Sequence, residues 1–202
     1  MDFLCRPAGT VAHLGVLAGT FNPPTNAHLS LARAALDQVD AVVLVLPRLL
    51  PHKSYDHGAA FNDRCRMLRA AVSVQPRMAA AVTSGGLFYE IAEECREAYG
   101  PQLRLAFLCG RDAAERIINW DYGTDAAIDE ILKGFNLLVA PRQGGYEPPA
   151  RLRDRVRPLH LAEDLDEVSS SEVRRLIQAG GAWEHLVPEA VVPIAREAYL
   201  PL

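Results

Sequence analysis

The chain has 202 residues, of which 50% are hydrophobic and 23% charged, as in a soluble globular protein large enough to bury a core. Lysine and arginine number 21 against 25 acidic residues, so a net charge of −4 offers no overall field for nucleic acid or anionic membranes. The four cysteines stand far apart in the sequence, which excludes a C-x-x-C pair and favours reduced thiols.

Apolar runs alternate with helical patterns along the whole chain. His13–Leu17 and the unbroken run Ala41–Leu46 read as buried strands, and Leu29–Leu36 between them has helical spacing. Further strands are expected at Met78–Val82, Leu103–Leu108, Phe135–Ala140 and, more weakly, Pro158–Ala162. Further helices are expected from Asn62 or Asp63 to Val74, over Tyr89–Tyr99, from Gly110 toward Trp120, over Asp125–Lys133, from Ser169–Ser171 to Gly180, and from Pro188 to Tyr199.

This alternation predicts an α/β fold, namely a doubly wound, Rossmann-like parallel sheet of five to six strands with helices on both faces. We expect a single domain over residues 1–202, with residues 1–12 as an N-terminal extension and 163–202 as a C-terminal helical part. Residues 1–12 lack a basic segment before a long apolar run, and no run of about 18 apolar residues occurs. A cytoplasmic location without membrane attachment is therefore expected.

Polar segments follow the predicted strands at their carboxyl ends, where ligands bind in sheets of this kind. They are Thr20–His28, Arg48–Lys53, Gly110–Asp112, Arg142 and Ser169–Arg174. Neither a G-x-x-x-x-G-K-[ST] loop nor a G-x-G-x-x-G after the first strand is present, which argues against P-loop chemistry and hydride transfer.

The first of these segments forms a strand-to-helix turn. Gly19 allows a close backbone approach, two consecutive prolines stiffen the turn, and Thr25 or Asn26 can cap the helix whose first turn holds His28. Free N–H groups and the positive end of the helix dipole then suit a phosphate. Turn chemistry alone favours an ordinary α/β turn with a surface histidine over a catalytic site.

The string Gly19-Thr20-Phe21-Asn22-Pro23-Pro24-Thr25-Asn26-Ala27-His28 resembles the (H/T)-x-G-H signature, preceded by G-T-F-D-P, of the nucleotidyltransferase superfamily related to class I aminoacyl-tRNA synthetases. Thr25 and His28 match the two signature positions. Ala27 stands where Gly is usual, and Asn22 where Asp is usual.

Three later motifs narrow the resemblance to the nicotinate or nicotinamide mononucleotide adenylyltransferases. These are Pro51-His52-Lys53 after the second strand, Gly110-x-Asp112 followed by Trp120, and Ser169-Ser170-Ser171-Glu172-Val173-Arg174, which is similar to I-S-S-T-x-[IV]-R. Taken singly, they also read as a solvated loop tip, a core tryptophan and a helix N-cap.

The resemblance implies an enzyme that joins AMP from ATP to a pyridine mononucleotide with release of pyrophosphate, in NAD biosynthesis. It implies catalytic roles for His28, Lys53 and Arg174. The ATP contacts it implies are Gly19, Thr20, Phe21, Thr25, His28, Gly110, Asp112, Arg142, Ser170, Ser171 and Arg174. The mononucleotide contacts it implies are Asn22, Lys53, Gly85, Gly86 and Trp120. Mg²⁺ is expected to enter with ATP and without a protein ligand, and a homo-oligomer is left open.

Ser84–Ile91 departs from the S-Y-T-x-D-T-L that members of this family typically have near the pyridine substituent. The departure keeps a rival open, an adenylyl- or cytidylyltransferase acting on another small phosphate ester. The residues Ala27 and Asn22 keep open a non-catalytic nucleotide-binding sensor. Acid or amide preference at the pyridine ring is left undecided by the sequence.

Overall fold

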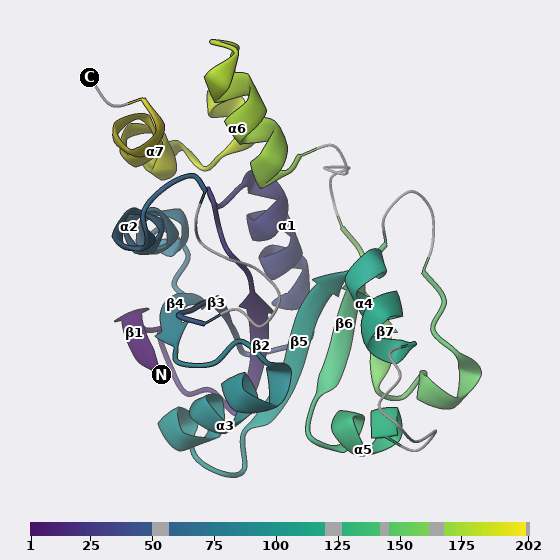
Figure 1. Ribbon diagram of the computed structural model, residues 1–202. Helices are drawn as coiled ribbons and strands as arrows, with labels where there is room; N and C mark the ends of the chain where they lie inside the picture. Colours follow the sequence, from purple (N-terminus) through teal and green to yellow (C-terminus); the bar gives the residue numbers. More distant parts are fainter. Residues whose placement is uncertain (50–56, 120–126, 142–145, 162–167, 201–202) are drawn as a thin grey trace.

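The computed structural model describes residues 1–49, 57–119, 127–141, 146–161 and 168–200 (Figure 1). Its strands are β1 (Asp2–Cys5), β2 (His13–Ala18), β3 (Ala41–Pro47), β4 (Met78–Thr83), β5 (Arg104–Gly110), β6 (Asn136–Ala140) and β7 (Val156–Pro158). Its α-helices are α1 (Asn26–Ala35), α2 (Phe61–Val72), α3 (Phe88–Tyr99), α4 (Arg111–Ile118), α5 (Ala127–Lys133), α6 (Ser170–Gln178) and α7 (Val192–Tyr199). Short 3-10 turns are η1 (Ala150–Leu152), η2 (Glu184–Leu186) and η3 (Glu189–Val191).

In the described part of the chain, seven strands form one sheet in the order β1-β4-β3-β2-β5-β6-β7. All neighbours are parallel except β1 and β4, which are antiparallel with Asp2 opposite Val82. The predicted doubly wound α/β fold is confirmed, but the expected number of five to six strands is too low. The added strand, β1, lies within residues 1–12, which were expected only as an extension. It is four residues long and sits at the sheet edge, so its sequence carries little strand signal.

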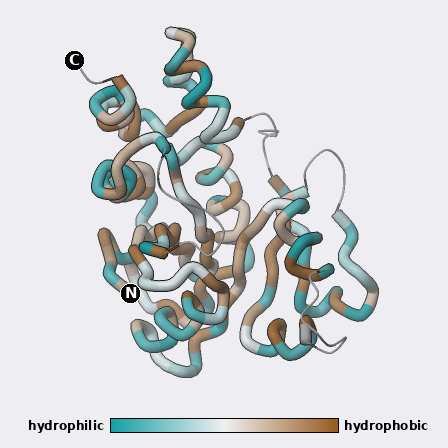
Figure 2. The backbone as a smooth tube through the Cα atoms, viewed as in Figure 1, coloured by the Kyte–Doolittle hydropathy of each residue, from teal (hydrophilic) through white to brown (hydrophobic). Residues whose placement is uncertain are grey.

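Helices cover both faces of the sheet (Figure 1). Helices α1, α2, α6 and α7 pack on one face, and α3, α4 and α5 on the other. Along β3 the side chains alternate between the two cores, so that Leu44 packs with the first group and Val43 with the second. The sheet is therefore buried between two layers of helices. In Figure 2 the central strands are mostly hydrophobic, while the helices carry hydrophilic residues on their outer sides.

Element boundaries differ from the expected ones near the end of the chain. The strand predicted at Pro158–Ala162 is β7 at Val156–Pro158, two residues earlier, because Val156 pairs with Leu137. The helix expected from Pro188 begins as η3, and α7 itself starts at Val192. No helix in the described ranges is long and apolar enough to cross a membrane. All four cysteines are free.

The order of the strands decides where a ligand can bind. From β2 the chain passes through β3 to β4 on one side, and then returns to place β5 on the other side of β2. Crossovers thus leave β2 and β5 in opposite directions, and open α/β sheets bind ligands beyond the carboxyl ends of such strands. Two of the predicted polar segments, Thr20–His28 and Gly110–Asp112, begin at these two strand ends.

Candidate active site

The turn between β2 and α1 extends the sheet and then reverses onto the helix. The Gly19 N–H donates to the Val45 carbonyl at 3.0 Å, which continues the β2–β3 pairing past the end of β2. Phe21 follows with φ of 42°, an uncommon conformation for a bulky residue, and its side chain is only 1% exposed. Thr25 is the extended N-cap residue of α1, one of the two caps that the sequence allows.

His28 is held from inside the same turn. The Thr25 N–H donates to His28 Nδ1 at 3.0 Å, and Thr25 Oγ1 lies 2.8 Å from the same nitrogen. Phe21 presents its ring to the imidazole at a centroid distance of 5.1 Å. Burial lowers the pKa of His28 to about 4, so the ring is neutral near neutral pH.

The hydrogen bond to Nδ1 also fixes the tautomer of this neutral ring. Because Nδ1 accepts from a backbone N–H, the ring proton resides on Nε2. His28 can therefore offer one N–H donor to an anionic ligand, which is compatible with the catalytic role that the resemblance implies. A neutral donor strengthens its hydrogen bond as negative charge develops on the acceptor.

Helix α6 is fastened to this turn by its first residues. Ser170 Oγ donates to the Pro23 carbonyl at 2.7 Å, and Arg174 Nη1 donates to the Asn22 carbonyl at 2.6 Å. Figure 1 shows the start of α6 beside the start of α1. The structure thus brings together two motifs almost 150 residues apart, as ligand binding at a common strand edge requires.

The start of α6 has the organisation expected from its serines. Ser169 Oγ accepts the Glu172 N–H at 3.2 Å and caps the helix. Arg174 Nη2 donates to Ser171 Oγ at 3.3 Å, which aligns the guanidinium along the first turn. Through its bond to the Asn22 carbonyl, the guanidinium lies beside the β2–α1 turn.

Asn22 has its side chain turned into the protein. It is 7% exposed; its Nδ2 donates to the His57 carbonyl at 2.8 Å, and its Oδ1 accepts the Ala59 N–H at 3.1 Å. The Tyr199 hydroxyl from α7 donates to the same Oδ1. Asn22 is therefore a structural junction, and its predicted contact with a mononucleotide remains a prediction.

Gly110 and Asp112 stand where β5 passes into α4. Gly110 is the N-cap residue of α4, and a Cβ at Gly110 would meet open space. Asp112 is exposed in the first turn and shares a shallow hollow with Glu115, Arg116 and Asn119. This carboxylate is accessible to a ligand at the carboxyl end of β5, and its ATP contact remains a prediction.

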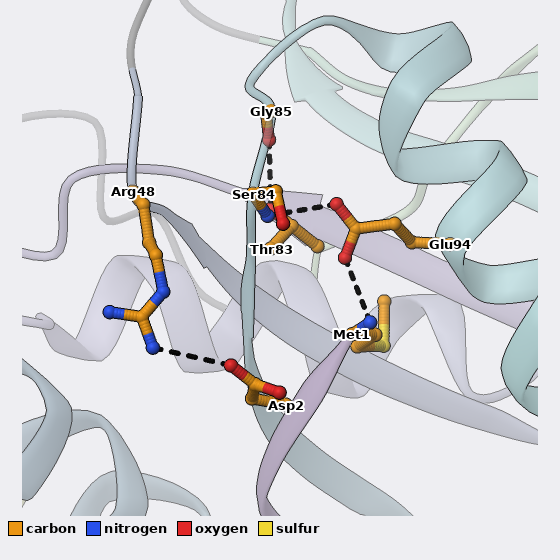
Figure 3. Close-up of polar contacts among 7 residues, drawn as sticks. All are labelled: Met1, Asp2, Arg48, Thr83, Ser84, Gly85 and Glu94. Carbon is orange, nitrogen blue, oxygen red and sulfur yellow. Dashed lines mark hydrogen bonds and ion pairs between the residues drawn. The ribbon is translucent and has the colours of Figure 1, made fainter.

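The turn after β4 is organised by two carboxylates that the sequence did not single out. Glu94 Oε1 accepts the Ser84 N–H at 2.8 Å (Figure 3), and Glu90 Oε2 accepts the Leu87 N–H at 3.0 Å. Gly85 packs on Glu90 so closely that a Cβ there would lie 2.1 Å from Oε2. The signal in the sequence was the spacing of Glu90 from Leu87, the N-cap residue of α3.

Figure 3 shows further polar contacts in and beside this turn. Thr83 Oγ1 donates to the Gly85 carbonyl at 2.9 Å, and the Met1 amino group lies 2.9 Å from Glu94 Oε2. Arg48 Nη2 pairs with Asp2 Oδ2 at 3.2 Å on the exposed side. Gly85 and Gly86 thus belong to a firmly held turn at the sheet edge, and their contacts with a mononucleotide remain a prediction.

Several predicted site residues fall outside the described ranges. Lys53, Trp120 and Arg142 are among them, so their roles stay as the sequence implied them. Within the described ranges, no three His, Cys, Asp or Glu side chains gather in a way that could hold a metal ion.

Arg64 is a buried residue of this region that the sequence patterns did not single out. It is 1% exposed, and its guanidinium donates from Nε to the Ala59 carbonyl at 2.7 Å and from Nη2 to the His57 carbonyl at 2.8 Å. A signal was available, since Arg64 shares the buried face of α2 with Met67 and Leu68. An arginine at helical spacing with core residues requires internal acceptors.

The sheet, its switch point and the helix starts beyond it define a Rossmann-like nucleotide-binding protein. A family model described as cytidylyltransferase-like matches residues 16–176. A Gloeobacter violaceus protein named "Probable nicotinate-nucleotide adenylyltransferase" is 32% identical over 89% of this chain and 91% of its own length. A Solibacter usitatus protein of the same name is 33% identical over 93% and 98%. The chain belongs to the cytidylyltransferase-like family, and within it to the nicotinate-nucleotide adenylyltransferases.

Solved structures are similar in fold. The Plasmodium falciparum nicotinic acid mononucleotide adenylyltransferase complexed with NaAD has a TM-score of 0.67 at 16% identity, covering 93% of this chain and 97% of its own. The same enzyme complexed with APC has a TM-score of 0.65, also at 16% identity, covering 92% and 95%. The predicted resemblance is confirmed by the family and the relatives, and the predicted fold by these structures.

Proposed function

We propose that this protein joins the AMP moiety of ATP to nicotinate mononucleotide, or to its amide counterpart, in NAD biosynthesis. A phosphate oxygen of the mononucleotide attacks the α-phosphorus of ATP, a new P–O bond forms, and the bond to the β-phosphate breaks to release pyrophosphate. Family membership and the names of the relatives support this reaction. The observation that carries it is the joining of the His28 turn to the Ser170–Arg174 helix start.

The attacking phosphate is ionised near neutral pH, so the reaction needs no general base. Catalysis then rests on alignment of the two nucleotides and on stabilisation of the charge that builds on the leaving pyrophosphate. His28 would supply its Nε2–H and Arg174 its guanidinium, both held by contacts within the protein. Lys53 is assigned to phosphate binding from its motif alone.

Mg²⁺ is part of the proposal as a companion of ATP. When bound, it neutralises charge on the triphosphate, and it prefers phosphate oxygens and water to a dedicated protein cage. We therefore assign it no protein ligand. We also propose a cytoplasmic location, no membrane or nucleic-acid partner, and leave a homo-oligomer as a question for sizing experiments.

The test is to incubate purified protein with Mg-ATP or Mg-CTP and a panel of phosphate esters while pyrophosphate and the dinucleotide are measured. Turnover with ATP and a pyridine mononucleotide is expected. Turnover only with CTP, or only with a non-pyridine ester, would favour the rival transferase that the Ser84–Ile91 segment keeps open. Binding of ATP without turnover of any acceptor would favour a nucleotide sensor.

A further inference from the structure

We propose that Tyr199, in the last turn of α7, is a positioning residue that acts through Asn22 on the guanidinium of Arg174. The inference rests on the proposed function, because it concerns the rate of the same phosphoryl-transfer step. Its basis is a chain of hydrogen bonds that runs from the C-terminal helix to a predicted catalytic side chain.

The first link is the side-chain amide of Asn22, which bonds to three groups of the protein. Its oxygen accepts from the Ala59 N–H and from the Tyr199 hydroxyl, while its nitrogen donates to the His57 carbonyl. Two donors on the oxygen and an acceptor on the nitrogen fix which way the amide faces. Without the hydroxyl, one of the two donors that define this orientation is lost.

The second link is the close packing around Asn22, which restricts the position of its side-chain amide. Gly58 has φ of 89°, and a Cβ there would lie 2.4 Å from Asn22 Nδ2. The buried Arg64 holds the carbonyls of both neighbours of Gly58, at 2.8 and 2.7 Å. The segment 57–59 is thus clamped between α2 and Asn22, directly after the part of the sequence that contains Lys53.

The third link is the backbone of Asn22, whose carbonyl accepts Arg174 Nη1 at 2.6 Å. Because the Asn22 side chain is fixed by its hydrogen bonds, the backbone carbonyl of Asn22 points in a fixed direction. The guanidinium is bonded to Ser171 as well, but at 3.3 Å, which is the weaker contact. The direction of the Asn22 carbonyl therefore decides where the cationic group points.

Tyr199 itself is suited to this role as a permanent donor. Burial raises the pKa of its hydroxyl, so the group stays protonated over the whole range in which the enzyme would be assayed. The Arg64 and Arg174 guanidinium groups and the Ala59 N–H oppose this rise in pKa, but burial outweighs them.

The test compares Tyr199→Phe with Tyr99→Phe as a matched control. Both remove one buried hydroxyl and keep the ring, but the Tyr99 hydroxyl has no hydrogen-bond partner in the described ranges. With Mg-ATP and nicotinate mononucleotide, Tyr199→Phe should lower kcat about 10-fold or more, because small misplacements of a catalytic group are costly. Its KM for ATP should change less than about twofold if only transition-state contacts are lost. Tyr99→Phe should retain kcat.

A double-mutant cycle with Arg174→Ala identifies the route of the effect. If Tyr199 acts through Arg174, adding Tyr199→Phe to Arg174→Ala should lower kcat no further. Additive losses would overturn the inference, and so would a Tyr199→Phe enzyme that melts earlier but keeps the wild-type kcat well below its melting temperature. If wild-type protein itself shows no turnover, the proposed function fails and the inference falls with it.

Discussion

At the scale of single residues, His28 shows how local packing sets the chemistry of a side chain. Its ring is neutral because burial lowers the pKa to about 4, and its proton sits on Nε2 because the Thr25 N–H occupies Nδ1. The side chain is thereby prepared as a hydrogen-bond donor before any ligand arrives. Such preorganisation costs no rearrangement at the moment of reaction.

His28→Ala is therefore expected to reduce kcat by about 10²- to 10³-fold, the usual effect of removing one donor to developing charge. ATP should still bind with nearly unchanged affinity, because the contact matters most in the transition state. Steady-state kinetics and calorimetric titration of ATP measure the two quantities separately. Unchanged turnover would remove His28 from the mechanism.

The pH dependence of stability offers a test of the His28 environment that needs no substrate. The folded pKa of about 4 lies below the ordinary value of 6.5, so the unfolded state takes up a proton first as the pH falls. The stability present above pH 6.5 is lost between that value and pH 4. From pH 7 to 5 the free energy of unfolding should drop by about 2 kcal/mol on this account.

Urea unfolding of wild-type and His28→Gln protein at pH 7 and pH 5 provides the measurement. The variant lacks the titrating ring, so its stability should fall less over the same interval. Equal losses in both proteins would show that His28 titrates normally in the folded state.

At the scale of elements, the predicted site is formed where the β2–α1 turn contacts segments of several helices. The β2–α1 turn is bonded to α6 through Ser170 and Arg174, and to α7 through Tyr199. The segment 57–59 before α2 joins them through Asn22. Since each element alone could shift, their mutual hydrogen bonds fix the relative positions of the groups that are predicted to bind phosphate.

Gly58→Ala should disrupt the packing of the segment 57–59 against Asn22. The new Cβ would lie 2.4 Å from Asn22 Nδ2 in a backbone conformation with φ of 89°, so we expect a loss of about 2–4 kcal/mol and reduced turnover. Gly9→Ala is a matched control, because Gly9 has φ of 82° and nothing within 4 Å of its Cβ position. It carries the backbone strain without the collision. Similar losses of stability in thermal unfolding of both variants would contradict this account.

At the scale of the whole molecule, one sheet separates two cores and carries the site at its edge. The core beneath α1 and α2 contains Leu44, a fully buried residue in the middle of β3. The predicted site residues lie beyond the strand ends, and of these Phe21 also belongs to this core. Leu44 is therefore expected to contribute to stability without a contact to the predicted catalytic groups.

Leu44→Ala should lower the free energy of unfolding by about 2–5 kcal/mol through lost burial and a cavity. Well below the melting temperature, kcat should stay near the wild-type value because no group at the strand edge is touched. Denaturant unfolding and initial rates measured on the same preparation test both halves of the prediction. A large fall in kcat of the folded variant would show that the β3 core positions the site.

The sequence by itself determined the alternation of strands and helices and the strand ends that carry polar groups, because hydrophobic periodicity and turn residues are local signals. It also pointed to the family, through short strings such as Gly19–His28. It missed the short edge strand β1, whose pairing with β4 is a contact between distant segments. Propensity within four residues could not reveal that contact.

Only the tertiary structure decided what the polar residues bond to. Asn22 fits a ligand-facing position in the sequence but is buried against Ala59 and Tyr199, and Arg64 becomes an internal clamp. The neutral state of His28 likewise arises from burial, which depends on the packing of the whole fold. Hydrogen bonds and desolvation depend on distances between segments that the linear chain does not encode locally.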